Sequence, residues 1–288
     1  MTRVFGVLGH PIDHSLSPAM HQAAFRALGL DAIYAPFDVP ARDLGRVLDG
    51  LEAAGASGLN VTVPHKEAVA RHLGRRRLVG AAAALGAVNT LVSSANGFRG
   101  HNTDVAGFQR VLDAELRVTA RGASVVLLGA GGAARAVAWA LLRGGVAAVA
   151  VANRTPRHAT RLIRWMRTVA GTGSRVRFDA IPFDRCAIGA ALAERGWLIN
   201  ATSLGLRLHD PQILPAGQIP KRSVVIDLVY RAPTTPLVRA ARRRGALATD
   251  GLPMLLYQGA EAFRLWWRRP PPVAAMRRAV EQAVRRRD

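Results

Sequence analysis

The stretch at residues 125–134, which reads Val-Val-Leu-Leu-Gly-Ala-Gly-Gly-Ala-Ala, decides the fold of this chain. Its four leading apolar residues predict a short strand that is buried on both faces. The alanine-rich segment 133–143 predicts a helix, and the glycines between strand and helix match the dinucleotide-binding pattern Gly-x-Gly-x-x-Ala. In that pattern the first glycine allows a tight turn, and the second lets the backbone approach a pyrophosphate. The final small residue lets the helix pack on its strand.

The turn and the start of the helix therefore form a candidate pyrophosphate site, because the free N–H groups of a helix start face bound phosphates. The candidate cofactor-binding residues here are Gly129, Ala130, Gly131, Gly132 and Ala133. The alternative is an ordinary strand-turn-helix in a chain rich in Gly and Ala. A second apolar strand at 146–152, at the distance that the fold requires, favours the dinucleotide site.

The end of that second strand indicates which dinucleotide binds. An acidic residue there would bind the ribose 2′-hydroxyl of NAD. This chain has Asn153, Arg154 and Thr155, with no acid nearby. A guanidinium and a hydroxyl suit a 2′-phosphate, so we expect NADP(H) as the cofactor. The alternative is a solvated arginine in an arginine-rich protein.

Composition limits the class of protein. Half of the 288 residues are hydrophobic, yet no apolar run approaches the roughly 20 residues that cross a bilayer. No signal-peptide core follows Met1. The single cysteine, Cys186, excludes an internal disulfide and fits a reducing compartment. The histidines show no metal-site spacing. We therefore expect a cytoplasmic protein with no metal and no membrane association.

The net charge of +21 by itself suggests a nucleic-acid partner. Of the 40 basic residues, however, only Lys66 and Lys221 are lysines, which leaves 38 arginines scattered along the chain. No aromatic stacking platform lies among them. A general bias toward arginine explains this charge as well, so we expect no specific nucleic-acid binding.

The first hundred residues alternate strand and helix patterns and carry polar residues where strands end. Ser15 and Ser17 lie in a loop before Pro18, which opens a helix to about residue 27. Ser17 occupies the expected N-cap position. Two serines beside a helix N-terminus also suit a carboxylate ligand.

The strand predicted at 58–63 carries two more polar residues, Asn60 and Thr62, on one side. Lys66 follows within a turn, and in a chain so poor in lysine it indicates a role that arginine cannot fill. The alternative is a solvated lysine at a helix start. Asp104 has two interpretations, a site carboxylate or merely the cap of the helix predicted from residue 105 to 115.

The remaining strand patterns, at 197–201, 224–228 and 246–249, alternate with helices and predict a parallel doubly wound sheet. We therefore expect an α/β protein with an N-terminal α/β domain at 1–104 and a Rossmann domain at 105–250. Residues 251–288 should complete the first domain, with a terminal amphipathic helix at 274–287 packing back on it.

Taken together, the motifs resemble the shikimate dehydrogenase family over essentially the whole chain. They occur in the family's order: Ser15-Leu16-Ser17-Pro18, Asn60-Val61-Thr62-Val63-Pro64-His65-Lys66, Gly86-Ala87-Val88-Asn89-Thr90, Asn102-Thr103-Asp104, Gly129-Ala130-Gly131-Gly132-Ala133, Asn153-Arg154-Thr155, Asn200-Ala201-Thr202-Ser203, Asp227-Leu228-Val229-Tyr230, and Gly251-Leu252-Pro253-Met254-Leu255 followed by Gln258.

The resemblance implies NADPH-dependent, reversible reduction of 3-dehydroshikimate to shikimate by a monomer or homodimer, a step of the shikimate pathway toward aromatic amino acids. It implies Lys66 and Asp104 as the catalytic pair. The remaining residues that it implies are Ser15, Ser17 and Tyr230 for the substrate carboxylate, Thr62, Asn89, Asp104 and Gln258 for its hydroxyls, and Leu228 and Gly251 for the cofactor.

The chain departs from the family pattern at two places. Val105 stands where glycine commonly follows Asn-Thr-Asp, and His158 stands where the family often has a second basic residue, for which Arg157 can substitute. Two alternatives remain open. One is a quinate/shikimate dehydrogenase of broader specificity, which shares the Ser-Leu-Ser-Pro and Lys/Asp motifs, and the other is a non-catalytic relative that binds nucleotide or nucleic acid, which only the net charge favours.

Overall fold

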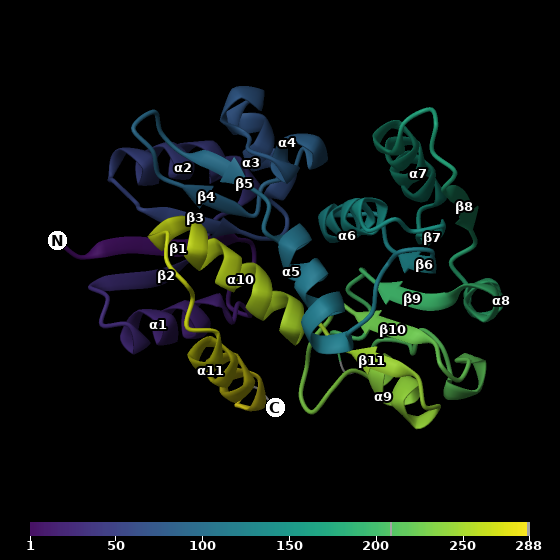
Figure 1. Ribbon diagram of the computed structural model, residues 1–288. Helices are drawn as coiled ribbons and strands as arrows, with labels where there is room; N and C mark the ends of the chain where they lie inside the picture. The colour runs from purple at the N-terminus through teal and green to yellow at the C-terminus, as the bar shows by residue number, and fades with distance from the viewer. Residues whose placement is uncertain (208, 287–288) are drawn as a thin grey trace. The chain divides into compact units, whose positions relative to one another are not determined.

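The computed structural model describes residues 1–207 and 209–286. Its backbone divides into two compact units. Unit 1 holds Met1–Gly107 and the chain from Leu255 onward, and unit 2 holds Phe108–Met254. Each unit is built around its own sheet, shown in Figure 1.

The sheet of unit 1 has the strand order β2-β1-β3-β4-β5. Its first three strands run parallel, and β4 and β5 are antiparallel to their neighbours. The bounds are β1 Arg3–Gly9, β2 Ala32–Asp38, β3 Gly58–Val61, β4 Thr90–Val92 and β5 Arg99–His101. β3 is the central strand, and because β4 runs antiparallel to it, the residues that follow β3 lie beside those that precede β4.

Helices cover both faces of this sheet (Figure 1). One face packs an aliphatic core that includes Leu48, Leu59 and Val69, and the other packs aromatic rings such as Phe5 and Trp266. The helices are α1 Ser17–Ala27, α2 Leu44–Ala53 with the 3-10 turn η1 Ala41–Asp43 before it, α3 Lys66–Leu73, the turn η2 Arg75–Arg77, α4 Ala81–Leu85, α5 Asp104–Arg110, α10 Leu252–Trp267 and α11 Val273–Arg285.

The C-terminal helix α11 packs against α1, so the predicted return of the tail to the first part of the chain is confirmed. The predicted end of that helix at residue 287 lies outside the described residues. The helix predicted for 105–115 is interrupted, because α5 gives way to a π-helical turn, η3 Val111–Leu116.

The sheet of unit 2 has six strands in the order β11-β10-β9-β6-β7-β8, and all neighbouring pairs are parallel. This is the strand order of the doubly wound dinucleotide-binding fold, so the predicted Rossmann fold is confirmed. The bounds are β6 Ser124–Leu128, β7 Ala148–Ala152, β8 Arg177–Ile181, β9 Gly196–Asn200, β10 Val224–Asp227 and β11 Leu247–Thr249.

Unit 2 contains one strand–helix pair that sequence analysis missed, β8 with the helix that follows it. The helices of this unit are α6 Gly132–Arg143, α7 Pro156–Ala170, α8 Arg185–Arg195 and α9 Pro236–Arg243, with the turn η4 Ala216–Gln218. Strand β8 lies at the sheet edge and is mostly exposed, so it lacks the apolar run that marks its neighbours.

Candidate functional site

Lys66 and Asp104 form the centre of the site in unit 1. Each is the first residue of a helix, α3 and α5 respectively. The Lys66 Nζ lies 2.6 Å from Asp104 Oδ2, and only 17% and 7% of the two side chains are exposed. A close, shielded ion pair of this kind keeps its partners in one geometry. The carboxylate of Asp104 therefore binds the lysine and is not merely a helix cap.

Two amide side chains surround this pair. Asn89 donates from Nδ2 to Asp104 Oδ1 at 2.9 Å and to Gln258 Oε1 at 3.2 Å. The backbone N–H of Thr103 donates to Asn89 Oδ1 at 2.7 Å. The structure thus brings together four predicted site residues from four separate segments of the chain.

Thr62 follows directly after β3 and is half-buried. Its methyl group packs against the backbone of Gly9, because a Cβ built at Gly9 would lie 2.5 Å from Thr62 Cγ2. A glycine at position 9 is therefore required for the threonine to take this place. Thr62 also orients the start of α3, since its carbonyl accepts the N–H of His65.

The prediction that Ser17 is the N-cap of α1 is wrong. Leu16 is the N-cap residue, and Ser17 is the buried first residue of the helix. The capping role moves to Ser15, whose Oγ accepts the backbone N–H of Ser17 at 3.3 Å. The reason is that Ser15, two residues upstream, forms the local turn that satisfies a free N–H of the helix start.

Beneath these residues lies a buried polar layer that sequence analysis did not assign to the site. Burial raises the pKa of the Tyr34 phenol, and its contact with the Ser17 hydroxyl opposes that rise. Tyr34 donates to Asn60 Oδ1 at 2.7 Å. The ring of His21 stacks on Tyr34 at 4.6 Å, and burial lowers the pKa of His21 to about 3, so this histidine is neutral. The signals for this layer in the sequence are the strand positions of Tyr34 and Asn60, and His21 carries none.

In unit 2, the two glycines of the dinucleotide-binding pattern have different surroundings. Gly129 has a φ of +100°, and a Cβ there would lie 2.8 Å from the carbonyl oxygen of Ala201, so the turn requires glycine. A Cβ at Gly131 would meet no atom within 4 Å. Gly131 precedes α6, where Ala134 is fully buried against the sheet. The open space over Gly131 fits a pyrophosphate lying against the start of this helix.

The predicted 2′-phosphate residues lie at the start of α7. Asn153 donates from Nδ2 to the carbonyl oxygen of Thr155 at 2.9 Å, which shapes this corner. Thr155 is the N-cap residue and Arg154 is exposed. A surface hollow of about 570 Å³ on the same helix is lined by Arg157, His158, Thr160, Arg161 and Arg164. The corner thus presents positive charge beside a helix N-terminus, which suits a phosphate group.

Leu228 and Gly251 are in direct contact. A Cβ at Gly251 would collide with the backbone carbonyl of Leu228, so only glycine lets these two segments approach. Leu228 follows Asp227, whose pKa is raised to about 6, mainly because burial disfavours its charge. Tyr230 lies in unit 2, two residues further along the chain from Leu228.

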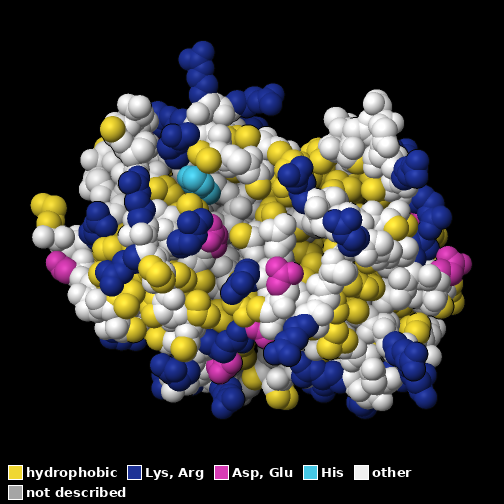
Figure 2. Space-filling model, viewed as in Figure 1, with side chains coloured by type: hydrophobic (Ala, Val, Ile, Leu, Met, Phe, Trp, Pro, Cys, Tyr) yellow, Lys and Arg dark blue, Asp and Glu magenta, His cyan; other side chains and the backbone are white. Residues whose placement is uncertain are grey.

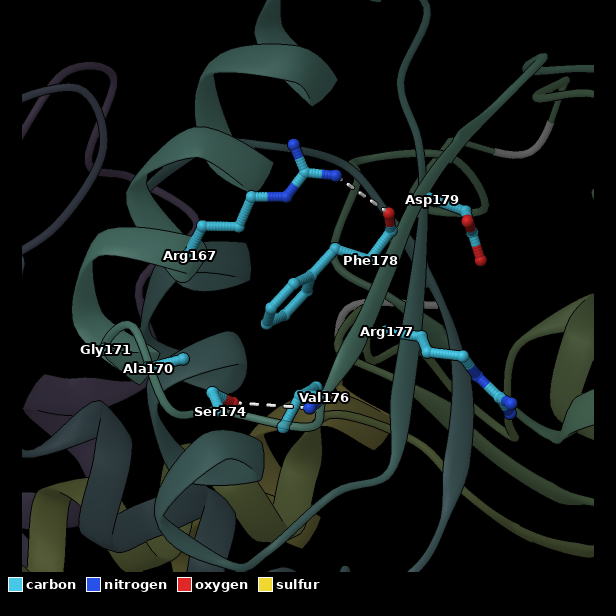
Figure 3. A pocket seen from close by; sticks show the side chains of 8 residues that line it. All are labelled: Arg167, Ala170, Gly171, Ser174, Val176, Arg177, Phe178 and Asp179. Carbon is cyan, nitrogen blue, oxygen red and sulfur yellow. Dashed lines mark hydrogen bonds between the residues drawn. The ribbon is translucent and has the colours of Figure 1, made fainter.

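A second hollow, of about 450 Å³, lies between α7 and β8 and is shown in Figure 3. It is lined by Arg167, Ala170, Gly171, Ser174, Val176, Arg177, Phe178 and Asp179, and it contains none of the predicted site residues. Three of its polar side chains have local partners, since Arg167 donates to the Phe178 carbonyl, the Ser174 hydroxyl accepts the Val176 N–H, and Asp179 accepts from Arg195. This hollow is a gap beside an edge strand.

Basic side chains are spread over the visible face and do not gather into one band (Figure 2). Within the described residues, no three His, Cys, Asp or Glu side chains come together as a metal site would require. Across the same part of the chain, every helix is too short or too polar to reach from one side of a bilayer to the other.

Three family models match successive parts of the chain. They are described as the shikimate dehydrogenase substrate binding domain over residues 7–91, the shikimate / quinate 5-dehydrogenase over residues 113–181, and the shikimate 5′-dehydrogenase C-terminal domain over residues 251–281.

Known proteins match over nearly the full length. The chain is 46% identical to the shikimate dehydrogenase (NADP(+)) of Rubrobacter xylanophilus, over 97% of this chain and 95% of that protein. Its fold is similar to that of Thermus thermophilus shikimate 5-dehydrogenase in complex with NADP(H) and shikimate, with a TM-score of 0.83, 39% identity, and coverage of 98% and 100%. It is also similar to Corynebacterium glutamicum quinate dehydrogenase in complex with NAD, with a TM-score of 0.87, 34% identity, and coverage of 98% and 99%.

These matches confirm the resemblance that the motifs predicted over essentially the whole chain. This chain belongs to the shikimate dehydrogenase family.

Proposed function

We propose that the protein catalyses the reversible reduction of 3-dehydroshikimate to shikimate with NADPH. The observation that carries this proposal is the shielded Lys66–Asp104 pair, with its 2.6 Å contact, surrounded by the amides of Asn89 and Gln258. When bound, NADPH supplies a hydride to the ketone carbon of the substrate. The ketone oxygen must then receive a proton, and Lys66 is the donor that this site offers.

In the proposed reaction, the Lys66 ammonium gives its proton to the developing alkoxide and later regains one from water. Asp104 holds the lysine and accepts a hydrogen bond from a substrate hydroxyl. Asn89 and Gln258 are assigned to the remaining hydroxyls, because their amides lie beside the same pair. Thr62 is assigned with them, because it lies between the end of β3 and the helix that Lys66 begins. No arginine could take the place of Lys66, since a guanidinium does not give up its proton in proteins.

The carboxylate of the substrate is assigned to Ser15 and Ser17 at the start of α1 and to Tyr230 of unit 2. The free N–H groups of a helix start favour an anion, which supports the two serines. The burial of Ser17 against Tyr34 leaves Ser15 as the more accessible of the two hydroxyls.

The cofactor is assigned to unit 2. The fingerprint residues Gly129, Ala130, Gly131, Gly132 and Ala133 would hold the pyrophosphate, Asn153, Arg154 and Thr155 the 2′-phosphate, and Leu228 and Gly251 the nicotinamide end. The open space at Gly131 and the exposed Arg154 support this assignment. Unit 1 is then the substrate domain and unit 2 the NADP domain, with chain boundaries close to the expected 104 and 251.

Initial rates with four substrate–cofactor pairs test the proposal. We expect the highest kcat/KM for shikimate with NADP⁺, compared with quinate and with NAD⁺. A protein that oxidised quinate with NAD⁺ faster would belong to the alternative with broader specificity, whose structural relative was found in complex with NAD. A protein that bound NADP⁺ without turnover would support the non-catalytic alternative.

Three further properties belong to the same proposal. We assign the protein to the cytoplasm because its single cysteine suits a reducing compartment. The assembly is a monomer or homodimer. The scattered arginines support a surface without a specific nucleic-acid partner, and salt-sensitive binding to generic DNA or RNA at physiological ionic strength would contradict this.

A further inference from the structure

A directed series of buried hydrogen bonds crosses unit 1 and ends on the carboxylate of Asp104. It begins at β2 and passes through β3 and β4. Its links are Tyr34 O–H to Asn60 Oδ1 at 2.7 Å, Asn60 Nδ2 to Thr90 Oγ1 at 3.1 Å, Thr90 O–H to Asn89 Oδ1 at 3.1 Å, and Asn89 Nδ2 to Asp104 Oδ1 at 2.9 Å.

The direction of the last link follows from the chemistry of its groups. An ionised carboxylate only accepts hydrogen bonds, so Asn89 must present its Nδ2 to Asp104. The amide oxygen of Asn89 then faces away from the carboxylate and needs donors of its own. Among the described contacts it has three, the backbone N–H of Thr103 at 2.7 Å, the hydroxyl of Thr90 at 3.1 Å and, more distantly, the hydroxyl of Thr103 at 3.3 Å.

The next links explain why Thr90 acts as a donor. Its hydroxyl carries one proton, and Asn60 Nδ2 already donates to its oxygen, so the proton is available to the amide oxygen of Asn89. The Thr103 hydroxyl lies 3.2 Å away, and either hydroxyl of that pair can be the donor. Tyr34 in turn holds the oxygen of Asn60, which keeps the Nδ2 of that amide on Thr90. Thr90 is fully buried and Asn60 is 5% exposed, so bulk water does not compete for these groups.

We propose that Thr90 and Asn60 are positioning residues for catalysis. They hold the amide of Asn89 in the orientation that donates to Asp104, and so keep the Asp104 carboxylate directed at Lys66. A reversed Asn89 amide would place Oδ1 against the carboxylate and repel it. This inference rests on the proposed function, because it concerns the same lysine–aspartate pair.

A double-mutant cycle tests the proposal, with Thr90→Val and Asn89→Ala made singly and together. Thr90→Val removes one hydroxyl and keeps the shape, and we expect kcat to fall by about 10- to 100-fold through loss of orientation. The dissociation constant for NADPH should stay within about 2-fold of wild type. In the Asn89→Ala background the same Thr90→Val change should alter kcat by less than about 2-fold, because the amide that the Thr90 hydroxyl orients is then absent.

The conservative variant and a matched control separate positioning from general destabilisation. Thr90→Ser keeps the hydroxyl and should restore kcat to within about 3-fold of wild type. Ser223→Ala removes a buried hydroxyl in unit 2 that donates only to the Pro220 carbonyl among the described contacts. This control should lower the melting temperature and leave kcat unchanged. If Thr90→Val does not fold, Asn60→Ala enters the same cycle.

Two results would overturn the inference. One is that Thr90→Val lowers kcat in the Asn89→Ala background by as large a factor as it does in the wild-type background. The other is that Thr90→Val in the wild-type background leaves kcat unchanged and lowers only the melting temperature. An inactive wild-type protein would instead refute the proposed function itself, so the two failures are distinguishable.

Discussion

The two units build their candidate sites from different parts of the chain. In unit 1 the site consists of buried side chains, with Lys66, Asp104 and Asn89 joined by bonds of 2.6 and 2.9 Å. In unit 2 it consists mainly of backbone, shaped by Gly129, Gly131 and a helix start. A side-chain network sets chemical reactivity, whereas a backbone cradle sets binding. Substitutions in the Lys66–Asp104–Asn89 network of unit 1 should therefore appear in kcat, and those in the dinucleotide-binding residues of unit 2 in cofactor affinity.

The largest effect should come from Lys66→Arg. The positive charge beside Asp104 is kept, but the guanidinium cannot release a proton. We expect a folded protein that still binds NADPH and whose kcat falls by about 10²- to 10⁴-fold, the usual contribution of general acid–base catalysis. Steady-state kinetics with melting curves measure both properties.

Lys221→Arg is the matched control for this change, because Lys221 is the other lysine and is exposed before β10. It should leave kcat and stability unchanged. If Lys66→Arg kept kcat within a few-fold of wild type, the lysine would serve as an electrostatic anchor and the proton would come from another group.

The next effect compares the two buried aspartates. Asp104 is paired with Lys66, whereas Asp227 in unit 2 is held by the hydrogen-bond donors Asn200 and the Val229 N–H. Burial raises the pKa of Asp227 from 3.8 to about 6. The folded protein therefore binds this proton more tightly than the unfolded chain, and the free energy of unfolding falls as pH rises from about 4 to 6.

Asp227→Asn removes that ionisation and keeps an oxygen for both donors. Relative to wild type, the variant should gain about 3 kcal/mol of unfolding free energy between pH 4 and pH 7.5, from about 1.4 kcal/mol per pKa unit. Urea unfolding of both proteins at pH 4 and at pH 7.5 measures these free energies. If the difference in unfolding free energy between variant and wild type did not change with pH, the pKa of Asp227 would not be raised in the folded protein.

A smaller effect should follow from Arg154→Ala, which tests unit 2 as a binding site. A charge-assisted contact with a 2′-phosphate is worth about 1.5–3 kcal/mol, which is about 10- to 150-fold in affinity. The KM for NADP⁺ should rise by this factor while the KM for NAD⁺ and kcat stay near wild type. Equal losses for both cofactors would show that Arg154 is structural.

The smallest effect should come from Ser15→Ala in unit 1. Ser15 is half-buried and would share the substrate carboxylate with other donors, so its contribution should be about 1 kcal/mol. The KM for shikimate should rise by about 3- to 10-fold with the KM for NADP⁺ unchanged. A lower melting temperature with an unchanged KM would show that Ser15 serves only the Ser17 N–H.

Local sequence signals predicted the Rossmann fold and the cofactor half of the site. The dinucleotide-binding pattern could be recognised in the sequence because its requirements are local. Gly129 needs a positive φ, and the buried strand before it needs an apolar run. The same reasoning missed β8, because an exposed edge strand has no such run. It also misplaced the cap of α1, since both Ser15 and Ser17 satisfy the local cap pattern.

The sequence by itself therefore determined the fold class and the glycine turn, and it predicted a role for Lys66, one of only two lysines in the chain. Only the tertiary structure brought Lys66, Asn89, Asp104 and Gln258 together and gave each amide its direction. Those features depend on which strands are neighbours and on which donor faces which acceptor across them. A hydrogen bond has direction only between groups in space, and groups separated by 169 residues meet only after the chain has folded.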